Sequence, residues 1–106
     1  SFFMTTIDQE LWDEVTQGVS GYSQDRIETP LKFPKGIQLR GKSYNKLRVS
    51  TRLNNQNNPN EFTSEIYDGS VERLASGKRT GNEMSEVHRD IINGIRGAYV
   101  KEHKND

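Results

Sequence analysis

The sequence of 106 residues contains no cysteine, only three prolines and one tryptophan, and no long run of apolar residues. The lack of cysteine excludes disulfides, thiolate chemistry and zinc sites built on cysteine. No segment approaches the roughly 18 consecutive apolar residues that indicate a membrane-spanning helix, and none has the apolar core of a signal peptide. We therefore expect a soluble, cytoplasmic protein of one small domain, with no membrane partner.

Basic and acidic residues balance over the whole chain, with 15 of each, but they are unevenly distributed. Residues 1–29 carry six acids and a single base, Arg26. Residues 30–60 contain no acid, and they hold seven bases: Lys32, Lys35, Arg40, Lys42, Lys46, Arg48 and Arg52. Such a block of one sign predicts that any function works through this basic middle segment.

The first quarter of the chain is predicted to hold an acidic helix. Residues 1–3 precede Met4 and are interpreted as a remnant of expression, while residues 4–29 form an acidic N-terminal helix and a connector. Thr6 and Gln9 fit a capping box, and apolar residues then recur at helical spacing, at Ile7, Leu11, Val15 and Val19. Pro30 and Pro34 argue against regular structure before residue 35.

From Gly36 the apolar residues alternate, which predicts strands at 36–40 and 46–53, joined by a turn over 41–45. A polar loop over 54–60 leads to a third strand at 62–67. Residues 70–75 are expected to be a short helical piece, which 77–81 interrupt. Thr80 and Glu83 fit a second capping box, opening a helix to about His103. Its predicted buried stripe is Met84, Val87, Ile91, Ile92, Ile95, Ala98 and Tyr99.

These elements predict an α+β fold in which residues 30–103 form a three-stranded antiparallel sheet packed by a C-terminal helix. The N-terminal helix is additional, and residues 104–106 are a frayed tail. Leu47, Val49, Thr51 and Leu53 would face the helices, which leaves the opposite face of the sheet open to solvent.

Basic residues on that open face, and in the loop before the last helix, are the candidate contacts to nucleic acid. A β-ribbon fits the major groove of duplex DNA, Lys and Arg neutralise phosphates, and a helix N-terminus attracts them. The candidate residues are Gln38, Arg40, Lys42, Tyr44, Lys46, Arg48, Ser50, Arg52, Lys78 and Arg79. The alternative is that the face is merely charged for solubility.

The stretch Pro34-Lys35-Gly36-Ile37-Gln38-Leu39-Arg40-Gly41-Lys42-Ser43-Tyr44 resembles the opening of the arm-type DNA-binding domains of phage tyrosine integrases. The plant ethylene-response-factor domains share this pattern. The resemblance implies a three-stranded sheet, packed by a C-terminal helix, that reads DNA through the sheet. This sequence departs from the pattern at Asn45-Lys46-Leu47, which looks inserted, and no recombinase catalytic region follows, so strand transfer is not implied.

Catalytic signatures are missing, so we expect no enzyme activity, no cofactor and no bound metal. His88 and His103 are the only histidines. We expect His88 on the helix surface and His103 in the frayed tail. Met84 lies at the spacing of a helical metal pair from His88, but this pair is not a site for a hard metal ion.

A second hypothesis is a small inhibitor or adaptor that binds a host or phage protein, such as a phage anti-defence protein. It would act through the sheet face or through the acidic helix, whose candidate contacts are Glu10, Trp12, Asp13 and Glu14. An exposed tryptophan is a frequent hot spot of such interfaces. The same acidic helix could instead cover the basic hairpin. The target sequence, the choice of DNA or RNA, and the oligomeric state stay open.

Overall fold

The computed structural model describes residues 21–22, 26–55, 57–69 and 72–106. The described elements are the strands β1 (Gly21–Tyr22), β2 (Arg26–Leu39), β3 (Lys42–Asn55), β4 (Asn58–Tyr67) and β5 (Arg73–Thr80), and the helix α2 (Met84–Glu102). The predicted acidic helix, with Glu10, Trp12, Asp13 and Glu14, lies outside the described residues.

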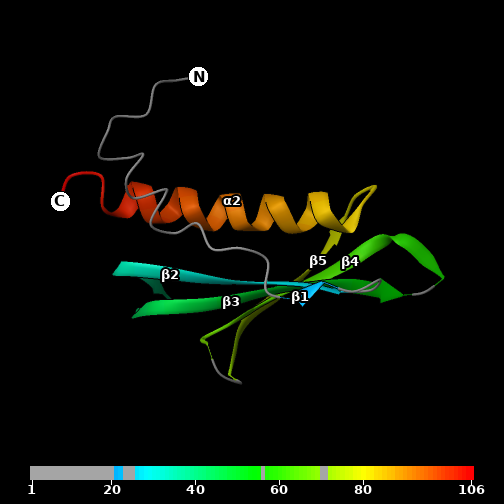
Figure 1. Cartoon of the computed structure of the whole chain (residues 1–106), viewed down its shortest axis with the longest axis horizontal. Helices are drawn as coiled ribbons and strands as arrows, with labels where there is room; N and C mark the ends of the chain where they lie inside the picture. Colours follow the sequence, from blue (N-terminus) through cyan, green and yellow to red (C-terminus); the bar gives the residue numbers. More distant parts are fainter. Residues whose placement is uncertain (1–20, 23–25, 56, 70–71) are drawn as a thin grey trace.

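The five strands form one antiparallel sheet in chain order, and α2 lies across one of its faces (Figure 1). The helix packs on β2, β3 and β4. The predicted α+β class, with an antiparallel sheet packed by a C-terminal helix, is confirmed. The predicted number of three strands is wrong, because the sheet has four long strands and the two-residue β1.

Strand β2 begins at Arg26, so the predicted connector up to Pro34 is largely a strand. Alternate residues are buried, namely Ile27, Thr29, Leu31 and Phe33. The prolines are tolerated because β1 pairs with β2 only opposite Ile27 and Glu28. Among the described residues the outer side of β2 is therefore an edge at Pro30, where a missing N–H costs little. Pro34 falls within a register shift between Lys32 and Ile37.

The turn between β2 and β3 consists of Arg40 and Gly41, and the predicted turn over 41–45 is wrong. Both turn residues have positive φ, 53° and 81°, as in the type I′ turns that match the twist of a hairpin. Strand β3 starts at Lys42 and continues to Asn55, and β4 starts at Asn58. The polar residues predicted as a loop therefore belong mostly to the ends of two paired strands.

Residues 73–80, predicted as a helical piece and a loop, form strand β5. Ala75 pairs with Ile66 and Gly77 with Ser64 of β4. The sequence contains helix signals here, but the open edge of β4 offers a ladder of hydrogen bonds that outweighs local propensity.

The final helix is confirmed, but its start is not the predicted capping box. Thr80 lies in β5, and the N-cap is Glu83, which makes no side-chain cap hydrogen bond. The C-cap is His103, as expected. The buried residues of α2 are Val87, His88, Ile92 and Tyr99. Ile91 and Ile95 are only partly buried and Ala98 is exposed, so the buried stripe is rotated from the predicted one.

Tyr99 lies at the centre of the core and is 0% exposed. Its ring meets the ring of Phe33 edge-on, with centroids 5.0 Å apart, and the ring of His103 at 4.8 Å. Its hydroxyl accepts a hydrogen bond of 3.1 Å from the backbone N–H of Lys35. The helix is therefore attached to β2 by both apolar and polar contacts of one side chain.

His88 is buried, and its predicted place on the helix surface is wrong. Its Nε2 lies 2.7 Å from Thr29 Oγ1 and its Nδ1 lies 2.8 Å from Thr51 Oγ1. Thr51 Oγ1 is in turn 3.1 Å from Ser64 Oγ. Burial lowers the pKa of His88. A neutral imidazole donates through one nitrogen and accepts at the other, so the hydroxyls satisfy it fully.

His103 is also buried, and its predicted place in a frayed tail is wrong. Its Nε2 lies 2.6 Å from the carbonyl oxygen of Gly36, and its Nδ1 lies 2.5 Å from Asp106 Oδ2. An imidazolium can donate from both ring nitrogens to these two oxygens at once, so the two contacts favour the protonated ring. Burial alone lowers the pKa of His103, but the Gly36 carbonyl and the Asp106 carboxylate outweigh it and hold the pKa above its usual value.

We expect the stabilisation from His103 to depend on pH. A raised pKa in the folded state means that this stabilisation is complete below the unfolded-state pKa of about 6.5 and is lost as pH rises through the folded-state value. His103→Gln should therefore remove the decline in unfolding free energy above this pH, as measured by urea denaturation over a pH series. Lys104→Gln, at the exposed neighbouring position, is the control. Identical pH profiles for the parent protein and His103→Gln would contradict this assignment.

Candidate nucleic-acid interface

The face of the sheet opposite α2 carries most of the charged side chains of the strands. In β3 the buried Leu47, Val49 and Thr51 point toward the helix, so Arg48 and Arg52 point away from it, as predicted. The cross-strand register assigns the remaining side chains. We call this surface the open sheet face; its residues are Arg26, Glu28, Lys32, Lys46, Arg48, Ser50, Arg52, Glu61, Thr63, Glu65, Tyr67, Arg73 and Lys78.

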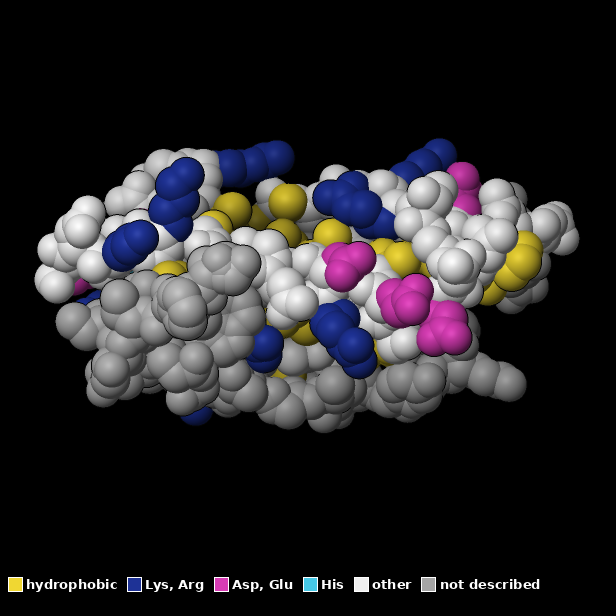
Figure 2. Space-filling model, turned by 90° about the horizontal axis from the view of Figure 1, so that it is seen from above, with side chains coloured by type: hydrophobic (Ala, Val, Ile, Leu, Met, Phe, Trp, Pro, Cys, Tyr) yellow, Lys and Arg dark blue, Asp and Glu magenta, His cyan; other side chains and the backbone are white. Residues whose placement is uncertain are grey.

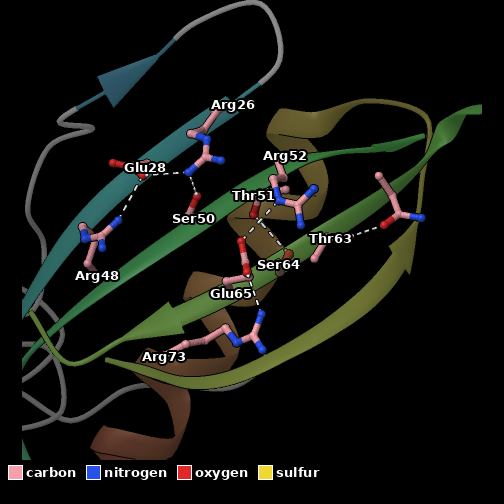
Figure 3. Close-up of polar contacts among 11 residues, drawn as sticks. Arg26, Glu28, Arg48, Ser50, Thr51, Arg52, Thr63, Ser64, Glu65 and Arg73 are labelled. Atoms are coloured by element: carbon pink, nitrogen blue, oxygen red, sulfur yellow. Dashed lines mark hydrogen bonds and ion pairs between the residues drawn. The ribbon is translucent and has the colours of Figure 1, made fainter. Parts of the chain in front are cut away.

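Two glutamates bridge four arginines across this face (Figure 3). Glu28 Oε1 accepts from Arg26 at 3.3 Å and from Arg48 at 3.0 Å. Glu65 accepts from Arg52 and from Arg73, each at 3.3 Å. Each carboxylate thus offsets one of its two arginines and fixes the direction of both.

The Glu65 side chain is only 6% exposed, while the Arg73 side chain beside it is 58% exposed. Burial by itself raises the pKa of Glu65, but the hydrogen bonds from Arg73 and Arg52 outweigh this and hold the pKa below its ordinary value. The carboxylate is therefore charged at neutral pH, and it holds its arginines in place.

Bases outnumber acids on the open sheet face by seven to three. Two cross-strand pairs have like charges directly opposite each other, Arg26 with Arg52 and Lys32 with Lys46. Like charges at such positions destabilise a sheet. Glu28 and Glu65 relieve the arginine pair, whereas Lys32 and Lys46 are both exposed. The face therefore keeps a local excess of positive charge at a cost in stability.

Tyr67 adds an aromatic ring to this face. The guanidinium carbon of Arg48 lies 4.2 Å from the centroid of that ring. Arg48 thus contacts Glu28 on one side and an aromatic face on the other, so its position is fixed by two neighbouring strands.

The ten residues predicted to contact nucleic acid separate into three groups. Lys46, Arg48, Arg52 and Lys78 come together on the open sheet face. Ser50 lies there too, but it is 0% exposed, and Arg26 Nη1 donates to its Oγ at 3.3 Å, so Ser50 does not contribute to the surface. A second group, Arg40, Lys42 and Tyr44, lines a pocket with Arg73.

The third group, Gln38 and Arg79, belongs to a different surface. They line a groove of about 330 Å³ between the sheet and α2, whose walls include Ile37, Leu39, Ile66, Ile91 and Ile95. The view from the helix side shows hydrophobic side chains at the surface among Lys and Arg side chains (Figure 2). Arg79 therefore does not extend the open sheet face, although it neighbours Lys78 in sequence.

Several residues of the open sheet face were missed by the sequence prediction. Arg26 and Glu28 were assigned to the connector, and Arg73 to a helical piece. Glu65 and Tyr67 lie in the predicted third strand, but only the register with β3 shows that they meet Arg52 and Arg48. The period-two pattern of residues 62–67 was the available signal for this pairing.

Among the described residues there is no group of three or more His, Asp or Glu side chains placed to hold a metal ion. In the same part of the chain, no helix is both long enough and apolar enough to cross a membrane. No family model, curated protein or solved structure matches the chain.

Proposed function

We propose that this protein is a small, non-catalytic nucleic-acid-binding protein that contacts duplex DNA through the open sheet face. The observation that carries the proposal is the like-charged cross-strand pair of Lys32 and Lys46, which lie directly opposite each other and are both exposed. Like charges directly opposite each other on neighbouring strands destabilise a sheet. A polyanion on this face would offset their repulsion.

The bridging glutamates support this proposal. An arginine that is held by a carboxylate still has further N–H donors, because the guanidinium carries five. Arg48 and Arg52 are held in this way by Glu28 and Glu65, at 3.0 and 3.3 Å. Contacts to phosphate or to a base edge would then immobilise less side-chain freedom than on a flexible face.

The test is the double substitution Lys32→Gln and Lys46→Gln. It removes two exposed charges that repel each other, so the fold should be retained or slightly stabilised. We expect it to weaken binding to a fluorescein-labelled duplex, and to reduce the slope of log K against log salt by about 2, one phosphate for each lysine. Fluorescence anisotropy at several salt concentrations measures both quantities.

The matched control is Arg89→Gln with Lys101→Gln, which removes the same charge from exposed positions of α2. It should leave the salt slope unchanged. Equal weakening by both double variants would mean that the effect comes from net charge alone and not from the open sheet face. The lack of any DNA or RNA binding by the intact protein at low salt would overturn the proposal.

The second candidate function is that of a protein-binding inhibitor or adaptor acting through the same face. Arg48 stacked on Tyr67 favours it, because arginine and tyrosine are enriched among interface hot spots. Capture of a protein partner from lysate that survives nuclease treatment and is lost in Tyr67→Ala, without intrinsic DNA affinity, would identify this function instead.

A further inference from the structure

A pocket of about 350 Å³ opens where the β2–β3 turn approaches the start of β5. Arg40, Lys42 and Tyr44 line it from the hairpin, and Glu72, Arg73 and Leu74 line it from the other side. Three basic residues and one acidic residue thus line the pocket. Because these cations come from segments some thirty residues apart in the chain, the fold rather than a local run of bases brings them together.

The backbone at Arg40 is unusual for an arginine. Its φ is 53°, in the left-handed region, and the first position of a type I′ turn is normally taken by Asn, Asp or Gly. For a residue with a long side chain, this conformation carries backbone strain and brings no compensating local hydrogen bond. This backbone conformation belongs to a turn residue that lines the pocket together with Lys42.

The walls of the pocket are attached to the core. Leu74 is 9% exposed and belongs to the hydrophobic core cluster, and Tyr44 packs against that cluster. Arg73 donates to Glu65 at 3.3 Å. Two lining residues are therefore anchored in the core and Arg73 is positioned by Glu65, while the lining residues carry hydroxyl, ammonium and guanidinium groups.

We propose that this pocket binds a phosphate group. Arg40 would supply a charge-assisted hydrogen bond from the turn, Lys42 a second from the start of β3 and Arg73 a third from β5, and the Tyr44 hydroxyl can donate a fourth. Arg40, Lys42 and Arg73 outnumber Glu72 among the lining residues, and the guanidinium of Arg73 keeps further N–H donors beside its bond to Glu65.

Two sources share this chemistry: a free phosphate monoester, and the phosphodiester backbone of a nucleic acid on the open sheet face. Arg73 lines the pocket and also belongs to the open sheet face, so the pocket adjoins that face at this residue. Only the diester source rests on the proposed function; the pocket itself does not.

The experiment is a titration of the full ¹⁵N-labelled chain with inorganic phosphate at constant ionic strength. We expect amide shifts centred on residues 40–44 and 72–74. Arg40→Gly with Lys42→Gln should weaken phosphate binding at least about tenfold, since it removes two charge-assisted bonds. Glycine suits the positive φ of residue 40, so this variant is expected to fold. The charge-matched control, Arg89→Gln with Lys101→Gln, should bind as the parent protein does.

Titrations with a nucleoside monophosphate, and with an oligonucleotide that has no terminal phosphate, separate the two sources. If the nucleoside monophosphate or the oligonucleotide competes with inorganic phosphate, this supports the pocket and identifies which of the two it binds. Shifts spread evenly over surface lysines, or unchanged phosphate affinity in the Arg40/Lys42 variant, overturn the pocket. If the pocket fails while Lys32→Gln/Lys46→Gln still weakens DNA binding, the proposed function stands alone. If phosphate binds but no nucleic acid does, the pocket stands and the proposed function fails.

Discussion

Tyr99→Ala is expected to lower the free energy of unfolding by about 3–5 kcal/mol, as removal of a large buried aromatic ring does. The ring is 0% exposed and contacts the rings of both Phe33 and His103. Domains of this size are stable by about 5–15 kcal/mol in total. The substitution would therefore remove a large part of the free energy of unfolding, and a measurable unfolded fraction is expected at moderate temperature.

Urea denaturation followed by circular dichroism measures this change. Tyr99→Phe is the matched control, because it keeps the ring and removes only the hydroxyl that accepts from Lys35 N–H at 3.1 Å. It should cost about 1 kcal/mol. A loss below 1 kcal/mol for Tyr99→Ala would mean that α2 is not held on the sheet by this ring.

The second large effect is expected at His88, whose imidazole joins α2 to β2 and β3 through hydroxyls. His88→Leu removes hydrogen bonds of 2.7 Å to Thr29 and 2.8 Å to Thr51. Thr51 keeps Ser64 as a partner, at 3.1 Å, but the buried Thr29 hydroxyl loses its side-chain contact. Such a loss costs about 1–3 kcal/mol for the unsatisfied group.

Replacing the partners together distinguishes this network from simple packing. His88→Leu with Thr29→Val and Thr51→Val should recover most of the stability, because no polar group is then left buried without a partner. Denaturation of the single and triple variants measures the difference. This account would be contradicted if Thr29→Val and Thr51→Val lowered the stability of the His88→Leu variant further, by the sum of their separate effects.

The same histidine predicts a pH dependence. Burial lowers its pKa in the folded state, so the unfolded chain takes up a proton first as pH falls. Stability is complete above the unfolded-state pKa of about 6.5, and it is lost as pH falls toward the folded-state value. His88→Leu should abolish this loss. Since His103 has the opposite sign, these two groups together place the stability maximum near pH 6.5.

The sequence predicted those parts of the fold in which a regular pattern extends along one element. Leu47, Val49 and Thr51 alternate with Arg48 and Arg52, so both faces of β3 followed from the sequence. The final helix followed from its apolar spacing. Pro30 and Pro34 misled the prediction for β2, because a proline argues against a central strand but not against an edge.

The contacts that organise the site could not be predicted, because they join distant residues. Glu28 and Arg48 are 20 residues apart, and Thr29 and His88 are 59 residues apart. An acid-free segment indicates a basic face only if its neighbours in the sheet are neutral. Here Glu28 and Glu65 come from outside residues 30–60 and bridge the arginines, and only the register of three strands reveals them.

The outer side of β2 also bears on how this chain behaves at high concentration. An exposed strand edge is a template for adding another strand, and aggregation often begins there. Within the described residues, β1 covers this edge only at Ile27 and Glu28. Beyond it the edge carries Pro30, Lys32 and Pro34, which are exposed. Prolines offer no N–H to an incoming strand and lysine repels a second copy, so this stretch of the edge disfavours the addition of another strand.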